Sequence, residues 1–171
     1  MVDVGAGDRL APTPTLMRYP LFLDLTNQPV VVIGAGKVAL RKIRSLLAAG
    51  AKVTVISPQA NRLPKAARWL RRRYRQGDLA GARLVVAATD DKRVNELVCA
   101  EAKRRRQLVN CVAPPLAGNF FVPAVARSGG ITLAISTDGA SPAFAKRLRR
   151  DLERFLAGGY AQLLKRMAAE R

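Results

Sequence analysis

Histidine is missing from the 171 residues of this sequence, and cysteine occurs only twice, as Cys99 and Cys111. The absence of histidine excludes His-ligated metal centres, Ser-His-Asp triads and histidine general bases. The two cysteines do not form a Cys-x-x-Cys pair and cannot build a structural zinc site by themselves. Because a free cysteine usually behaves as a small buried apolar residue, we expect two buried, reduced thiols.

Acidic and aromatic residues are also scarce. The chain has 12 Asp and Glu against 30 Lys and Arg, which gives a formal net charge of +18. A surface with this charge attracts polyanions, namely nucleic acid, an anionic membrane, or a small molecule with many carboxylates or phosphates. Aromatic residues make up only 5% of the chain, which disfavours nucleic-acid binding through base stacking.

Long apolar runs are absent as well. No run reaches the roughly 18 residues that cross a membrane, and the acidic start Met1–Asp8 lacks the apolar segment of a signal peptide. We therefore expect a cytoplasmic protein without a membrane segment. The length predicts one full domain with a small appendage, and 49% apolar with 25% charged residues is typical of a globular chain.

Alternating strands and helices are predicted for the first two thirds of the chain. The β-branched run Val30–Ile33 is typical of a parallel strand buried on both faces, and an amphipathic helix follows it and ends near Gly50. Further strands are predicted at 52–56, 69–74, 83–88 and 107–112, with helices at 61–67 and after the capping residues 89–91. This order predicts an α/β fold with a Rossmann-like, doubly wound parallel sheet.

The pattern changes after Pro115. Two strands are predicted at 120–125 and 131–136, separated by turn residues at 127–130. Ser141 is expected to cap a basic helix from Pro142 to about Leu156, because serine suits the cap and proline the first helical position. The pair Gly158-Gly159 then precedes a short closing helix.

The segment from Gly34 to Ala39 matches the pattern G-x-G-x-x-A. In a Rossmann fold such glycines permit a tight turn and let the backbone approach a pyrophosphate, which binds amides at the start of the next helix. The position between a β-branched strand and a helix favours this interpretation over a purely structural turn. We expect Gly34, Gly36, Lys37 and Val38 to bind NAD.

The second predicted strand ends in Ser57, Pro58 and Gln59, with no acidic residue to bind the ribose of NAD. The partner of the ribose would be Ser57, Gln59 or the backbone. Because Arg62 is nearby, NADP is kept as an alternative cofactor. Thr89 follows the fourth predicted strand and is expected at the same carboxyl edge of the sheet, where parallel sheets bind their ligands.

Two arginine runs, 71–73 and 104–106, have three interpretations: a solvated surface, a field that attracts an anionic substrate, or a nucleic-acid site. The second run falls in the last turn of a predicted helix, where cations are favourable. Neither run is interleaved with aromatic side chains that could stack on bases. We therefore expect no dedicated nucleic-acid site.

Three stretches carry a resemblance to one family: GAGKVALRKIRSLLAAGAKVTVISP, AATDDKRVN and LVNCVAPPLAGNFFVPAVARSGGITLAISTDGASPAFAKRLRRDLE. From about Tyr19 to Phe155 the chain resembles the siroheme synthase N-terminal module, the precorrin-2 dehydrogenase/sirohydrochlorin ferrochelatase family. The resemblance implies NAD-dependent oxidation of precorrin-2 to sirohydrochlorin, with insertion of ferrous iron in some members. It also implies an intertwined homodimer.

On this resemblance the chain divides into a flexible leader (1–18), a Rossmann-like NAD-binding domain (19–115), a small dimerisation β segment (116–140) and a C-terminal helical part (141–171). The helical part is shorter than is usual in the family. Precorrin-2 is a polycarboxylate, so a protein with a net charge of +18 suits such a substrate.

The sequence departs from the family at the position of its acid/base aspartate, where Ala113 stands. Alanine cannot transfer a proton, so either solvent takes the proton or another carboxylate substitutes. Asp138 is the candidate catalytic substitute, and the alternative is a turn residue before Gly139, a position that aspartate favours. A catalytically silent carrier or sensor that binds NAD or a tetrapyrrole is the alternative function. No metal ligands are predicted.

Overall fold

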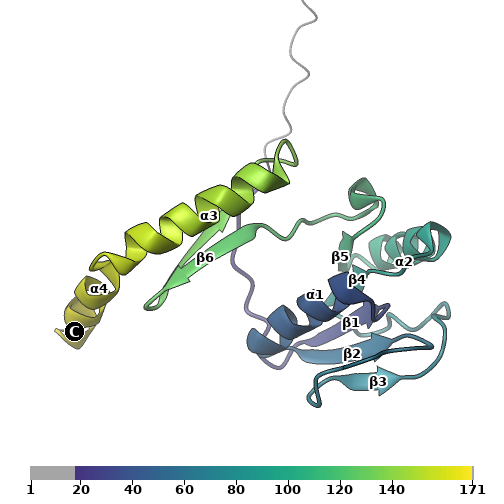
Figure 1. Cartoon of the computed structure of the whole chain (residues 1–171). Coiled ribbons are helices and arrows are strands. Elements are labelled where there is room, and N and C mark those ends of the chain that lie inside the picture. The colour runs from purple at the N-terminus through teal and green to yellow at the C-terminus, as the bar shows by residue number, and fades with distance from the viewer. Residues whose placement is uncertain (1–17, 171) are drawn as a thin grey trace, which may run out of the picture. The chain divides into compact units, whose positions relative to one another are not determined.

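The computed structural model describes residues 18–170, which form two compact units. One unit spans Leu23–Val122, and the other comprises the described residues 18–22 and 123–170. The predicted leader lies outside the described residues except for Arg18. Figure 1 shows both units.

A five-stranded parallel sheet forms the centre of the Leu23–Val122 unit (Figure 1). Its strand order is β3-β2-β1-β4-β5, and the predicted doubly wound, Rossmann-like sheet is confirmed. The central strands consist almost entirely of apolar residues because a parallel strand covered by helices is buried on both faces. The strands are β1 (Pro29–Ile33), β2 (Lys52–Ile56), β3 (Arg68–Leu70), β4 (Leu84–Ala87) and β5 (Leu108–Cys111).

One face of the sheet is covered by α1 (Lys37–Ala48). This helix buries Ala39 and Ile43 in a cluster that also contains Val30 and Val32 of β1. Alternate residues of β1 point to opposite faces, so its other apolar side chains face away from α1.

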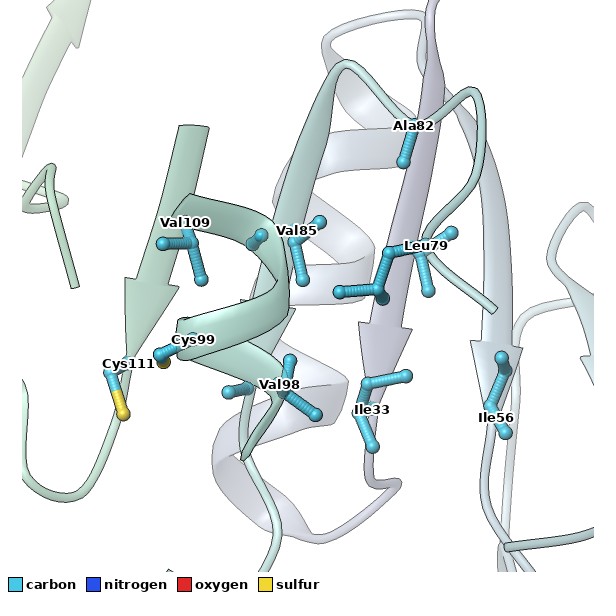
Figure 2. Close-up of a cluster of buried hydrophobic side chains, with 12 residues drawn as sticks. Ile33, Ile56, Leu79, Ala82, Val85, Val98, Cys99, Val109 and Cys111 are labelled. Carbon is cyan, nitrogen blue, oxygen red and sulfur yellow. The ribbon is translucent and has the colours of Figure 1, made fainter. Parts of the chain in front are cut away.

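The opposite face is covered by α2 (Lys92–Arg104). Figure 2 shows Val98 and Cys99 of this helix lying over Val85 and Val109 of the sheet. The strands are therefore fixed between two apolar layers, and the loops at their ends carry the polar groups.

The strand order reverses between β1 and β4. From β1 the chain builds β2 and β3 on one side, and it then returns to build β4 and β5 on the other. Ligands of open parallel sheets bind beyond the carboxyl ends of the strands at such a switch point. Because the strands are parallel, the loops after β1, β2, β4 and β5 all begin at this edge.

The segment between β2 and β3 differs from the prediction. No helix forms over 61–67, which is irregular with a turn at Lys65 and Ala66. Pro64 lies inside the predicted helix, where it cannot donate a backbone hydrogen bond and clashes with the preceding turn. The third strand is shorter than predicted because the chain turns after Leu70, whose carbonyl accepts from the backbone N–H of Arg72 at 2.8 Å.

The second unit is a β-hairpin with two helices. The hairpin turn is Gly129-Gly130, with φ of +53° and +92°. The third helix packs along the hairpin (Figure 1). The elements are β6 (Ala124–Ser128), β7 (Ile131–Ile135), α3 (Pro142–Ala157) and α4 (Tyr160–Ala169).

The predicted start of α3 is confirmed, because the Ser141 hydroxyl accepts from the backbone N–H of Phe144 at 3.2 Å. The first hairpin strand begins at Ala124 and not at 120. Phe120 instead donates its backbone N–H to the carbonyl of Val109, at 3.4 Å. Within residues 18–170, no helix is long and apolar enough to cross a membrane.

Candidate functional site

Gly34 follows β1 in a conformation that glycine adopts far more readily than other residues. Its φ is +103°, and its backbone N–H donates to the carbonyl of Ile56 at 2.9 Å. A Cβ atom at this position would lie 2.3 Å from the carbonyl oxygen of Ala88, far inside van der Waals contact. Glycine therefore lets the loop after β1 pass close to the end of β4.

Gly36 caps α1 and leaves the N-terminus of this helix open. The backbone of Gly36 is extended, no side chain caps the helix, and the first turn holds no acidic residue. Leu40 donates its N–H to the Gly36 carbonyl at 2.9 Å, so the amides of residues 37–39 have no partner within the helix.

Space is available in front of these amides. A Cβ atom on Gly36 would meet nothing within 4 Å, and the two predicted contacts Lys37 and Val38 are exposed. An anionic group can approach the free amides, and the helix dipole favours negative charge there. The loop after β1 thus has the shape and polarity that a pyrophosphate requires.

The loop after β2 is held by Ser57, which is buried. Its hydroxyl donates to the carbonyl of Gln59 at 2.7 Å, and its own carbonyl accepts from the indole N–H of Trp69 at 2.9 Å. Pro58 and Gln59 are exposed. The loop offers a ribose the Gln59 side chain, the lone pairs of the Ser57 hydroxyl and the backbone, and no carboxylate.

Thr89 follows β4 and is bound to α2 by Asn95, whose side chain is fully buried. Asn95 Oδ1 accepts from the backbone N–H and the hydroxyl of Thr89, at 3.0 and 2.8 Å. Asn95 Nδ2 donates to the carbonyls of Thr89 and Ala113, at 3.0 and 3.1 Å. The amide uses both donors and both acceptor positions, and it joins the loops after β4 and β5.

Asn95 is not identified by the motifs of the sequence. The only sequence signal is its spacing: Asn95 precedes Val98 by three residues and Cys99 by four, so it lies on the same helix face as these two buried side chains. A polar residue on the apolar face of a helix needs a buried partner, but the sequence does not say which one.

We expect Asn95→Leu to lower the free energy of unfolding by about 2–4 kcal/mol, because it removes all four hydrogen bonds between the buried Asn95 amide and the half-buried polar groups of Thr89 and Ala113. Denaturation in urea measures this loss. Glu96→Gln is the matched control, because Glu96 is exposed on the same helix, and it is expected to change stability by less than about 0.5 kcal/mol. Equal stability of N95L and the wild type would contradict the assigned role.

Ala113 lies two residues after β5 and is half-buried. Its carbonyl is held by Asn95, and its methyl side chain offers no proton acceptor. The structure thus fixes the backbone of this position but supplies no acid or base from it.

Asp138 belongs to the second unit, in the turn after β7. Its φ is +50°, and Gly139 follows at +90°. The carboxylate accepts from the guanidinium of Arg18 at 2.6 Å and from the hydroxyl of Ser136 at 3.3 Å. These features favour the interpretation of Asp138 as a turn residue over the catalytic alternative.

One arginine from each basic run forms an ion pair inside the parallel-sheet unit. Arg72 holds both carboxylate oxygens of Asp78 at 2.7 Å, and Arg105 binds Glu101 at 2.8 Å. Burial alone would raise the pKa of Glu101, but hydrogen bonds from the Tyr74 hydroxyl, a backbone N–H and Arg105 hold this pKa below its usual value. Parts of both runs are therefore structural.

Both cysteines are free and buried, as predicted. Burial, together with the neighbouring Cys111 thiol, raises the pKa of Cys99 to about 12. The Cys99 thiol therefore stays protonated and poorly reactive at neutral pH. No group of three or more His, Cys, Asp or Glu side chains among residues 18–170 could hold a metal ion.

Two protein-family models match this chain. One, described as NAD(P)-binding, covers residues 21–124, and the other, described as the central part of a sirohaem biosynthesis protein, covers residues 128–154. The first model spans the parallel sheet with its two helices, and the second spans β6 from its last residue, β7 and most of α3.

Curated relatives carry the names of two enzymes of sirohaem biosynthesis. The precorrin-2 dehydrogenase of Bacillus subtilis is 31% identical over 154 residues, which are 86% of this chain and 94% of that protein. The siroheme synthase of Chromobacterium violaceum is 39% identical over 153 residues, which are 85% of this chain but only 32% of that protein. The chain thus spans about a third of the length of that siroheme synthase.

The solved structure of SirC, a precorrin-2 dehydrogenase, is similar to this chain with a TM-score of 0.73 at 34% identity. The match covers 86% of this chain and 76% of the other. The likeness in structure therefore extends well beyond the glycine-rich loop.

Proposed function

The chain belongs to the precorrin-2 dehydrogenase family, and from this premise we propose that it oxidises precorrin-2 to sirohydrochlorin with NAD+. The observation that carries the proposal is the open N-terminus of α1 behind Gly36, at the switch point of the sheet. We place the reaction in the cytoplasm, a reducing compartment that suits two free thiols.

The residues at the carboxyl edge of the sheet fit the cofactor. The free amides at the start of α1 suit the pyrophosphate, and the loop after β2 offers hydrogen-bonding groups for the ribose. When bound, NAD+ supplies the hydride acceptor. The proposed contacts are Gly34, Gly36, Lys37, Val38, Ser57, Pro58, Gln59 and Thr89.

The charge of the chain supports a polycarboxylate substrate. A net charge of +18 raises the rate at which a polyanion encounters the protein. A polycarboxylate needs only this positive charge, whereas a single-stranded nucleic acid would also need aromatic side chains for base stacking, which are scarce in this chain.

Oxidation of precorrin-2 removes a hydride, which reduces NAD+, and a proton. Because Ala113 cannot accept that proton, we propose that water takes it. The role of the protein is then to position the reactants. Asn95 fixes the backbone of the loops at Thr89 and Ala113, and the open N-terminus of α1 binds the cofactor.

The alternative role of Asp138 as proton acceptor is tested by Asp138→Asn. Asparagine tolerates the left-handed backbone at this turn but cannot act as a base. We expect kcat to stay within about twofold of the wild type, because the carboxylate is bound to Arg18 and Ser136 in a turn. A loss of about a hundredfold or more at unchanged melting temperature would assign the proton transfer to Asp138.

We further propose that the chain is a homodimer formed through the second unit. A two-stranded hairpin is marginal alone, and α3 and α4 leave large apolar side chains exposed, including Phe144, Phe155 and Met167 at 57–60%. Light scattering should give twice the 18.5 kDa of one chain. A monomer at micromolar concentration would contradict this proposal.

A catalytically silent carrier of NAD or a tetrapyrrole is the second candidate function, and Ala113 is the observation that favours it. Mixing the purified protein with precorrin-2 and NAD+ under anaerobic conditions separates the two. The dehydrogenase produces NADH and sirohydrochlorin, whereas a carrier binds both ligands without converting them. Ferrous iron added afterwards tests whether the same chain also makes siroheme.

A further inference from the structure

A second cavity lies at the amino edge of the parallel sheet, where the strands begin, opposite the carboxyl edge described above. Its volume is about 520 Å³, and its walls come from the starts of β1, β4 and β5 and from the chain after α2. Figure 2 shows Ala82, one of its lining residues, at this edge and away from the strand arrowheads. A volume of this size can hold a small organic molecule.

The cavity carries positive charge that the protein does not balance. Its charged lining side chains are Arg83, Arg105 and Arg106, and none of the described residues that line it is acidic. Arg83 and Arg106 form no ion pair with a carboxylate of residues 18–170. Arg105 binds Glu101 through Nε at 2.8 Å, which leaves its terminal nitrogens as donors. Three guanidinium groups around one cavity suit a dianion such as phosphate.

The end of α2 does not need these guanidinium groups as caps. Its last carbonyls accept the backbone N–H groups of Arg105, Arg106 and Gln107, at 2.9–3.0 Å. Arg106 moreover has a φ of +56°, in the left-handed region that a helix end usually fills with glycine. An unfavourable backbone at a residue that lines a cavity is characteristic of ligand sites.

Gln107 fixes one wall of the cavity and adds an acceptor without a partner. The residue is only 9% exposed, and its Nε2 donates to the carbonyls of Leu79 and Ala82, at 2.6 and 2.7 Å. These two bonds leave Oε1 as the remaining atom of the amide, and this buried oxygen has no hydrogen-bond partner within residues 18–170. A buried acceptor requires a proton donor, so a ligand that completes the site carries a hydroxyl group as well as negative charge.

We propose that this cavity binds a phosphate dianion that also presents a hydroxyl group, which is either hydrogen phosphate itself or a phosphate ester of a hydroxylated small molecule. The three guanidinium groups bind the phosphate oxygens, and the hydroxyl group donates to Oε1 of Gln107. The site is separate from the dinucleotide site, because the amino and carboxyl edges of a parallel sheet lie at opposite ends of the strands.

Calorimetry with inorganic phosphate, sulfate and ribose 5-phosphate tests the proposal at about pH 8, where phosphate is mainly the dianion. Sulfate has the same charge but no proton to donate, so we expect phosphate to bind about tenfold more tightly. Tighter binding of ribose 5-phosphate than of phosphate would identify an ester as the ligand, and weaker binding would identify free phosphate. Saturating NAD+ should leave these affinities unchanged. Equal affinity for phosphate and sulfate, or competition by NAD+, overturns the inference.

Arg106→Gly separates binding from folding. Glycine removes the guanidinium and also relieves the left-handed backbone. We expect R106G to weaken phosphate about tenfold or more and to raise the melting temperature in phosphate-free buffer by about 2 °C or more. An unchanged affinity for phosphate, or a lower melting temperature, would give Arg106 a structural role and overturn the inference.

Two further variants separate a specific site from general attraction to a basic protein. Arg83→Gln removes a lining guanidinium and should weaken phosphate about tenfold. Arg104→Gln is the matched control, because Arg104 is exposed at the end of α2 and does not line the cavity, and it should preserve the affinity within about twofold. Equal weakening by R83Q and R104Q would show general attraction and overturn the inference.

Discussion

Replacing Gly36 by aspartate is expected to abolish dinucleotide binding while leaving the domain folded. The new side chain would enter the space in front of the α1 amides, where a Cβ atom alone meets nothing within 4 Å. Its negative charge would occupy the helix N-terminus and repel the pyrophosphate. We expect the Kd for NAD+ to rise at least a hundredfold, measured by calorimetry.

The melting temperature of G36D should stay close to the wild-type value, because Gly36 already has an extended backbone and an open surface. An aspartate at the N-cap even favours the helix. Gly36→Ala is the graded control. It adds a methyl group to the same space without a charge, so it should raise the Kd for NAD+ by less than G36D does. Unchanged affinity in G36D would remove the cofactor site from the loop after β1.

Replacing Gly34 by alanine is expected to act on the fold itself. The added Cβ atom would lie 2.3 Å from the backbone oxygen of Ala88, and a side chain at φ +103° is strained wherever it points. The obstacle is backbone, so it cannot rotate away. We expect the variant to lose about 3 kcal/mol or more in the free energy of unfolding, measured by urea denaturation, or to fail to fold.

The two glycines thus form an internal comparison, two residues apart in one loop. G34A is expected to lower the free energy of unfolding, whereas G36D is expected to lower only the affinity for NAD+. If G34A unfolds at the same urea concentration as the wild type, the close approach between the loop after β1 and the end of β4 is wrong. Comparison with G36A shows whether a methyl group in this loop is harmful in general.

The elements that sequence patterns predict well are those fixed by local chemistry. The β-branched runs at 30–33 and 52–56 became strands, and Ser141 caps a helix with Pro142 at its first position. The glycine pattern after β1 predicted the open helix N-terminus because this feature is also local: it depends on the backbone conformation of Gly34 and on the missing side chain of Gly36. The basic helix predicted at 61–67 is absent, and Pro64 within this segment is a local signal against a helix there.

The contacts that the sequence does not predict join distant residues. Asn95 bonds to Ala113, 18 positions away, and Trp69 bonds to Ser57, 12 positions away. Both bonds depend on which strands are neighbours and on their register, which residue patterns do not specify.

The oxidation of precorrin-2 by NAD+ is tested most directly by its stoichiometry. Purified protein, freshly generated precorrin-2 and NAD+ are mixed without oxygen, and the absorbances of NADH and sirohydrochlorin are followed together. Our account predicts that the two products appear at equal rates in equal amounts with the wild type, and that G36D yields neither. Binding of both ligands without either product would contradict the account and favour a silent carrier, for which Ala113→Asp would be the next variant.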